Sequence, residues 1–170
     1  KLNLILENKS REPVEGQLKF QFANKQIEKK VKISAQNKKM VELTSKEHPE
    51  LVLQNPKLWW PHTIGEPNLY EASVTFENSN IVSDKEKFDF GIREIDDYVN
   101  KQGHRGYKVN GRKIMIKGAG WTDNMMLEDT HEKNEARIKY AKHLNLNTIR
   151  LEGFWGKDEQ LYELCDKHGI

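Results

Sequence analysis

The chain has 170 residues, of which 36% are hydrophobic and 32% charged, and its formal net charge is +2 at pH 7. This length excludes a complete (β/α)8 barrel, which takes about 250 residues, and recurring aromatic and β-branched residues argue against disorder. The two charge signs are interspersed and no apolar run approaches the roughly 20 residues of a membrane span, so we expect neither a nucleic-acid partner nor a membrane segment.

The first half of the chain alternates apolar and polar residues, which is typical of strands. Apolar residues recur at every second position in 2–6, 18–22 and 70–76, and shorter apolar runs lie at 27–33, 40–43 and 87–92. A period of two places the apolar side chains on one face of a half-buried sheet. Because polar turns separate the runs, the pattern predicts about seven strands in an all-β immunoglobulin-like sandwich.

The periodicity changes after residue 93. The pair Asn110-Gly111 lies between two extended runs and predicts a hairpin, because both residues tolerate positive φ angles. The strand that leaves this hairpin is predicted at 113–117, and Gly118 to Gly120 would form a tight turn after it. A dinucleotide-binding loop is disfavoured there, because Asp123 stands in place of the motif's third glycine and would repel a pyrophosphate.

Two helices are predicted around a second strand at 147–152. Asp129 followed by Glu132 predicts an N-cap and a capping box for the first helix, and Gly169 predicts the end of the second. Their apolar faces carry Ile138, Ala141 and Leu144 in the first helix and Leu161, Leu164 and Cys165 in the second. Strands that alternate with helices predict parallel βαβ units.

These patterns predict an immunoglobulin-like β-sandwich at 1–95, a junction at 96–106, and a truncated α/β segment at 107–170. The last segment would be the amino-terminal fragment of a (β/α)8 barrel, containing its first two βα units. Two units cannot close a barrel, and the chain begins inside an apparent strand, so we expect it to be cut from a longer protein. The open helix faces of such a fragment predict self-association.

Polar and aromatic side chains follow the two predicted barrel strands. They are Trp121, Thr122, Asp123 and Asn124 after the first strand and Arg150, Glu152 and Trp155 at or after the second. The carboxyl ends of barrel strands meet on the functional face, and an aromatic platform among hydrogen-bonding groups suits a sugar. The alternative is that the tryptophans pack in the core and that Arg150 and Glu152 form an internal ion pair.

Other residues give weaker signals. Asp123 and Glu152 are the only carboxylates at these strand ends, and a supporting role for them is favoured over a catalytic pair. None of the six histidines pairs at metal-ligand spacing and Cys165 is the one cysteine, so no metal is predicted. Trp59 and Trp60 are either the platform of a non-catalytic carbohydrate-binding module or packing against the neighbouring domain, and packing is favoured.

Five motifs, taken together, resemble glycoside hydrolase family 2. They occur in the family's order at 55–61 (NPKLWWP) through 65–70 (GEPNLY), 90–93 (FGIR), 109–114 (VNGRKI), 117–121 (KGAGW) and 147–150 (NTIR). The resemblance implies the same architecture, a sandwich followed by the start of a (β/α)8 barrel. The runs 118–127, 150–153 and 161–169 resemble the exo-β-D-glucosaminidase and β-mannosidase branch of that family.

By this resemblance, Trp121 and Asp123 line the subsite for the non-reducing sugar, and Arg150 orients the nucleophilic carboxylate. Glu152 matches a carboxylate that binds the substrate's ammonium, which favours an exo-β-D-glucosaminidase acting on chito-oligosaccharides over a β-mannosidase. The family's catalytic carboxylates follow the fourth and seventh barrel strands, so none is expected in this chain and it should be inactive alone. The resemblance implies an oligosaccharide substrate, no metal or other cofactor and, by analogy, export from the cell.

Overall fold

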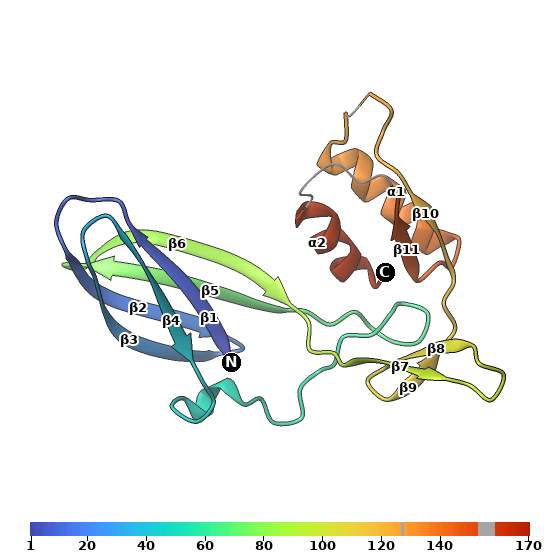
Figure 1. Ribbon diagram of the computed structural model, residues 1–170, viewed down its shortest axis with the longest axis horizontal. Helices are drawn as coiled ribbons and strands as arrows, with labels where there is room; N and C mark the ends of the chain where they lie inside the picture. The colour runs from blue at the N-terminus through green and yellow to red at the C-terminus, as the bar shows by residue number, and fades with distance from the viewer. Residues whose placement is uncertain (127, 153–158) are drawn as a thin grey trace. The chain divides into compact units, whose positions relative to one another are not determined.

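The computed structural model describes residues 1–126, 128–152 and 159–170 (Figure 1). The chain divides into two compact units. Unit 1 contains Lys1–Pro56 and Tyr70–Phe90, and unit 2 contains Lys57–Leu69 and Gly91–Ile170. In the described ranges no helix combines the length and apolar character needed to cross a membrane.

Unit 1 is an all-β sandwich, as the alternating pattern predicts. Its strands are β1 (Leu2–Asn8), β2 (Val14–Phe22), β3 (Lys25–Ile33), β4 (Asn37–Leu43), β5 (Tyr70–Asn78) and β6 (Ile81–Phe90), with a short 3-10 helix, η1, at Pro49–Leu51. The antiparallel pair β1-β4 forms one sheet and β3-β2-β5-β6 forms the other. The fully described range 2–90 thus holds six strands rather than about seven, one for each of the six apolar runs, and the run at 87–92 lies mostly in β6, which begins at Ile81.

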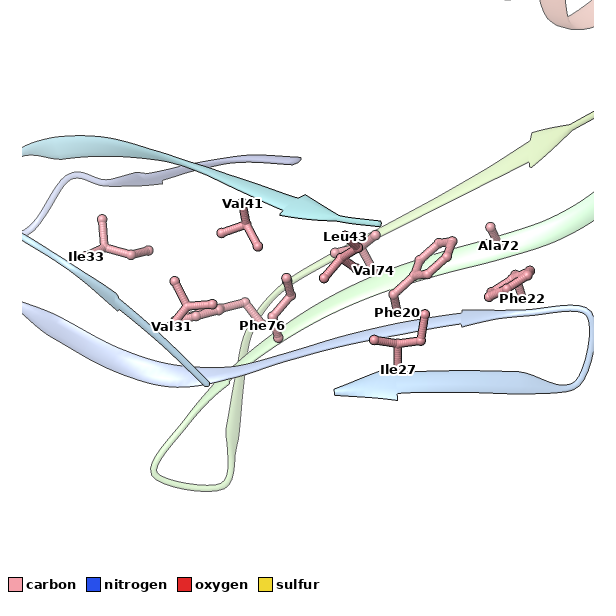
Figure 2. Packing of buried hydrophobic residues seen from close by; sticks show 11 residues of the cluster. Phe20, Phe22, Ile27, Val31, Ile33, Val41, Leu43, Ala72, Val74 and Phe76 are labelled. Atoms are coloured by element: carbon pink, nitrogen blue, oxygen red, sulfur yellow. The ribbon is translucent and has the colours of Figure 1, made fainter. Parts of the chain in front are cut away.

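The core of unit 1 lies between these two sheets. Leu18 on β2 and Leu43 on β4 are each 1% exposed, and the apolar positions of β1 alternate in burial as a half-buried strand requires. Figure 2 shows Val41 and Leu43 of β4 among the side chains of the other sheet, including Phe20 and Val74. The predicted strand runs therefore point their apolar residues into one core.

Unit 2 contains a small antiparallel sheet. It contains β7 (Ile95–Val99), β8 (Arg105–Val109) and β9 (Arg112–Ile114) in the order β7-β8-β9. Asn110 and Gly111 join β8 to β9 with φ angles of 50° and 76°, which confirms the predicted hairpin. The residues predicted as a junction, 96–106, lie mostly in the β7–β8 hairpin.

The remainder of unit 2 is a strand–helix–strand–helix segment. Its elements are β10 (Gly118–Trp121), α1 (His131–His143), β11 (Thr148–Leu151) and α2 (Glu159–His168). β10 pairs with β11 in parallel, as predicted, with Gly118 opposite Thr148 and Trp121 opposite Leu151. Figure 1 shows this pair of strands with both helices beside it.

The position of the first parallel strand was predicted wrongly. Gly118 to Gly120 do not form a turn after a strand at 113–117, because they are the strand β10 itself. Asn147 fixes this register, since its Oδ1 accepts a hydrogen bond from the Lys117 amide at 2.9 Å and its own amide donates to the Lys117 carbonyl at 2.8 Å. At Gly118 a Cβ would lie 2.7 Å from the Thr148 carbonyl oxygen, so the close strand approach requires glycine.

The two helices bury most of the residues predicted for their apolar faces. The burial of Leu144 and the N-cap of α1 differ from the prediction. Ile138 and Ala141 of α1 and Leu161, Leu164 and Cys165 of α2 are buried, whereas Leu144 is 52% exposed. Thr130, not Asp129, is the N-cap of α1, and its hydroxyl accepts from the Lys133 amide at 3.3 Å. Burial raises the pKa of the Cys165 thiol to about 11, so this thiol stays protonated near neutral pH.

Candidate functional site

Trp121, Arg150 and Glu152, three of the predicted site residues, lie at the carboxyl ends of the paired strands β10 and β11. Trp121 lies opposite Leu151 in the parallel register, and the Glu152 amide donates to the Trp121 carbonyl at 2.8 Å. This bond extends the pairing one step beyond β11 and fixes the backbone of Glu152 next to the end of β10. Arg150 is paired with Gly120 in the same ladder.

Arg150 and Glu152 form an ion pair at this edge. The Arg150 Nε donates to Glu152 Oε1 at 2.7 Å, and Arg150 Nη2 bonds to the same oxygen. The two side chains are 80% and 41% exposed, respectively, so the pair faces solvent rather than the interior. An exposed pair of this kind contributes only about 0–1 kcal/mol to stability.

Gly120 leaves space for the Glu152 carboxylate. A Cβ added at Gly120 would lie 2.8 Å from Glu152 Oε1 and 3.2 Å from its Oε2, so the carboxylate lies directly over the glycine. The side chain of Glu152 therefore crosses back over the end of β10. Gly120, which the sequence pattern assigns to a turn, is therefore a strand residue that packs against this carboxylate.

The two β10 glycines should respond differently to alanine. We expect Gly118→Ala to lower the free energy of unfolding by about 1–3 kcal/mol, because its Cβ would meet the Thr148 backbone oxygen at 2.7 Å and force the strands apart. Gly120→Ala should cost less than about 1 kcal/mol, because only the end of the flexible Glu152 side chain must move. Urea denaturation of the two variants measures both values, and an equal loss in both would contradict this account.

Trp121 and Asp123 occupy different environments. Trp121 is 6% exposed and packs with Ile138 and Leu161 in the core of unit 2, and the Arg137 guanidinium lies 3.9 Å from its ring centroid. Asp123 is half-buried in the loop after β10. The sugar-binding roles of both remain predictions, and Trp155 lies outside the described residues.

Trp59 is a packing residue of unit 2. It is 4% exposed, and its Nε1 donates to the Asp166 carbonyl at 2.7 Å. The Arg93 guanidinium lies 4.2 Å from the Trp59 ring centroid and bonds to Asp166 Oδ1 at 2.7 Å. The Trp59 carbonyl accepts from Asn110 Nδ2 at 2.9 Å. This ring is therefore not exposed as a sugar platform, and the favoured packing interpretation describes it.

The segment Lys57–Leu69, which contains Trp59, is hydrogen-bonded near the amino end of β11. The His62 amide donates to the Gly169 carbonyl at 3.0 Å, and its Nε2 lies 2.6 Å from the Leu146 carbonyl oxygen. Asn147 Nδ2 donates to Thr63 Oγ1 at 3.2 Å. Lys57–Leu69 thus covers the end of β11 opposite to Arg150 and Glu152, an arrangement that the sequence pattern did not reveal.

Among the described residues, no three His, Cys, Asp or Glu side chains gather as a group that would hold a metal ion. The polar side chains at the strand ends are Thr122, Asp123 and Asn124 after β10 and Arg150 and Glu152 at the end of β11. Such a set binds hydroxyl and ammonium groups through hydrogen bonds and charge.

Comparisons with known proteins agree with this architecture. The family model of glycosyl hydrolases family 2 matches residues 1–93. An exo-β-D-glucosaminidase of Streptomyces avermitilis is 40% identical over 140 residues, which are 82% of this chain and 15% of that protein. A mannosylglycoprotein endo-β-mannosidase of Lilium longiflorum is 30% identical over 129 residues, 72% of this chain and 13% of that protein.

Among solved structures, the exo-chitosanase CsxA of Amycolatopsis orientalis matches with a TM-score of 0.84 and 30% identity, covering 99% of this chain and 19% of that chain. A variant of that enzyme is described in complex with PNP-β-D-glucosamine. The present chain spans about 15% of the length of the curated relatives that it matches. On the family match and the identity to these relatives, the chain belongs to glycosyl hydrolases family 2.

Proposed function

We propose that this chain is part of a retaining exo-β-D-glucosaminidase that removes non-reducing glucosamine from chito-oligosaccharides. Unit 1 is its spacer sandwich, and the segment from β10 to α2 supplies the first two βα units of a (β/α)8 barrel. One observation carries the proposal: Glu152 presents a half-exposed carboxylate at the carboxyl end of β11, beside the end of β10. The exo-β-D-glucosaminidase relatives support the same conclusion.

In the proposed mechanism, residues of this chain bind the sugar and the remainder of the enzyme supplies the two catalytic carboxylates. Glu152 binds the ammonium at carbon 2 of the sugar, and Asp123 accepts hydrogen bonds from its hydroxyls. Arg150 has five N–H donors and uses two of its nitrogens on Glu152, while Nη1 orients the nucleophilic carboxylate. That carboxylate attacks the anomeric carbon, and a second one protonates the leaving oxygen and then activates water.

A β-mannosidase is the second candidate. The lily endo-β-mannosidase relative favours it. A mannoside carries an axial hydroxyl at carbon 2, where glucosamine carries an equatorial ammonium. In that case Glu152 would accept a hydrogen bond from the 2-hydroxyl and keep its pairing with Arg150. The two substrates therefore differ at carbon 2, both in the group and in its configuration.

Hydrolysis of paired substrates by the complete enzyme separates these functions. We expect kcat/KM for p-nitrophenyl β-D-glucosaminide to exceed that for the β-mannoside by about 100-fold, because a charge-assisted hydrogen bond contributes about 1.5–3 kcal/mol. The 170-residue chain alone serves as the control and should hydrolyse neither. A preference for the mannoside would favour the second candidate. Activity of the isolated chain would contradict the proposal that both catalytic carboxylates lie outside it.

A further inference from the structure

Arg137 of α1 makes three contacts with the chain that leaves β10. Its guanidinium lies 3.9 Å from the Trp121 ring centroid, its Nη2 donates to the Thr122 carbonyl at 2.7 Å, and its Nη1 bonds to Asp129 Oδ1 at 3.3 Å. The three groups belong to the end of β10, the residue after it and the residue before the N-cap of α1. One side chain thus connects both ends of this loop to the helix.

Asp129 extends the connection to the residue next to Asp123. Its second oxygen, Oδ2, accepts from the Asn124 amide at 2.8 Å. The side chains of Arg137 and Asp129 are 38% and 19% exposed, so water competes only in part for these bonds. Of the backbone groups on either side of Asp123, the Thr122 carbonyl is therefore bonded to Arg137 and the Asn124 amide to Asp129, the ion-pair partner of Arg137.

We propose that Arg137 is a positioning residue for the sugar subsite. It acts through the backbone on either side of Asp123 and sets the direction in which that carboxylate approaches the substrate's hydroxyls. An arginine is required because its planar guanidinium stacks on an aromatic face while it donates from two edges, which a lysine ammonium cannot do. This inference rests on the proposed function only in assigning Asp123 to the sugar.

The first test compares matched arginine variants in the complete enzyme. We expect Arg137→Lys to lower kcat/KM for p-nitrophenyl β-D-glucosaminide about 10- to 100-fold, because a misplacement of about 1 Å is enough to cost that much. Asp129→Asn should lower it in the same direction by a smaller factor. Arg105→Lys is the control, since Arg105 forms an exposed ion pair with Asp97 at 3.0 Å in the β7–β8 hairpin, and it should leave kcat/KM within about twofold.

A double-mutant cycle separates positioning from general damage to the fold. When Asp123→Ala has already removed the carboxylate, Arg137→Lys should reduce kcat/KM further by less than about threefold. A merely structural role would give the same 10- to 100-fold loss in both backgrounds, and that result would overturn the proposal. Melting temperatures identify any variant that has unfolded, in which case Asp129→Asn provides the cycle instead.

The result remains interpretable if the substrate assignment is wrong. Should the wild-type enzyme prefer the β-mannoside, the cycle is measured with that substrate, because Arg137 holds the loop irrespective of the group at carbon 2. Non-additivity with the mannoside would then support Arg137 as a positioning residue while the glucosaminidase proposal fails. Additive losses with the preferred substrate would reject Arg137 and leave the proposed function standing.

Discussion

Glu152→Gln is expected to lower kcat/KM for p-nitrophenyl β-D-glucosaminide about 100-fold in the complete enzyme. The substitution keeps the size of the side chain above Gly120 but removes the negative charge to which the proposed function assigns the substrate's ammonium. A charge-assisted hydrogen bond contributes about 1.5–3 kcal/mol, and each 1.4 kcal/mol is tenfold in rate. Steady-state kinetics at fixed ionic strength measure the loss.

Two comparisons make this result specific. Hydrolysis of the β-mannoside should change by less than about threefold in Glu152→Gln, because that substrate offers no cation to the lost charge. Glu163→Gln removes an equivalent charge from an exposed position on α2 and should leave both activities unchanged. Equal losses on the two substrates would indicate that Glu152 acts through its ion pair with Arg150 instead of binding the ammonium.

Trp59→Ala should lower the free energy of unfolding of unit 2 by about 3–5 kcal/mol. The change removes a buried indole, its hydrogen bond to the Asp166 carbonyl and its contact with the Arg93 guanidinium. All four tryptophans of the sequence lie in unit 2, so tryptophan fluorescence during urea denaturation reports on this unit alone. The three remaining tryptophans keep the signal usable in the variant.

Trp60→Ala is the matched control. Trp60 is only half-buried, and the same truncation should therefore cost less than at Trp59. If Trp59→Ala instead kept full stability and abolished binding of chito-oligosaccharides to the chain, the carbohydrate-binding module would be the better interpretation.

The sequence predicts those parts of the fold that depend on neighbours in the chain. Alternation in 18–22 and 70–76 indicates buried strand faces because successive side chains point to opposite sides of a sheet. Asn110-Gly111 indicates its hairpin because few residue pairs accept two positive φ angles. The apolar side of α2 follows from the spacing of Leu161, Leu164 and Cys165, all of which are buried.

The predictions of the first parallel strand and of the α1 N-cap are wrong because contacts with residues elsewhere in the chain determine the local structure there. Gly118 and Gly120 have poor intrinsic strand preference, yet both lie in β10 because they pair with Thr148 and Arg150 of β11. A Cβ at Gly118 would meet the Thr148 carbonyl oxygen. Asp129 has the chemistry of an N-cap, but it bonds to Arg137 and the Asn124 amide, and Thr130 takes the cap. Neither outcome is visible in a local pattern.

The candidate site shows the same division. That Arg150 and Glu152 stand at the edge where two parallel strands end follows from topology, which the alternation of strands and helices predicts. The roles of Arg93, Asp166 and Arg137 in packing were missed. Each of these residues contacts a partner that is distant in the sequence, and hydrophobic periodicity does not reveal such pairs.

The Lys57–Leu69 segment has a consequence for how the chain folds during synthesis. Trp59 leaves the ribosome 107 residues before Asp166, which holds its indole nitrogen. At about 5–20 residues per second, that separation means several seconds of waiting. Meanwhile β1 to β6 are complete as soon as Phe90 has emerged, so the sandwich can close while the Lys57–Leu69 loop still lacks its partner Asp166. The interval is long enough for a chaperone to bind that loop, and slower translation through 91–166 would lengthen its exposure.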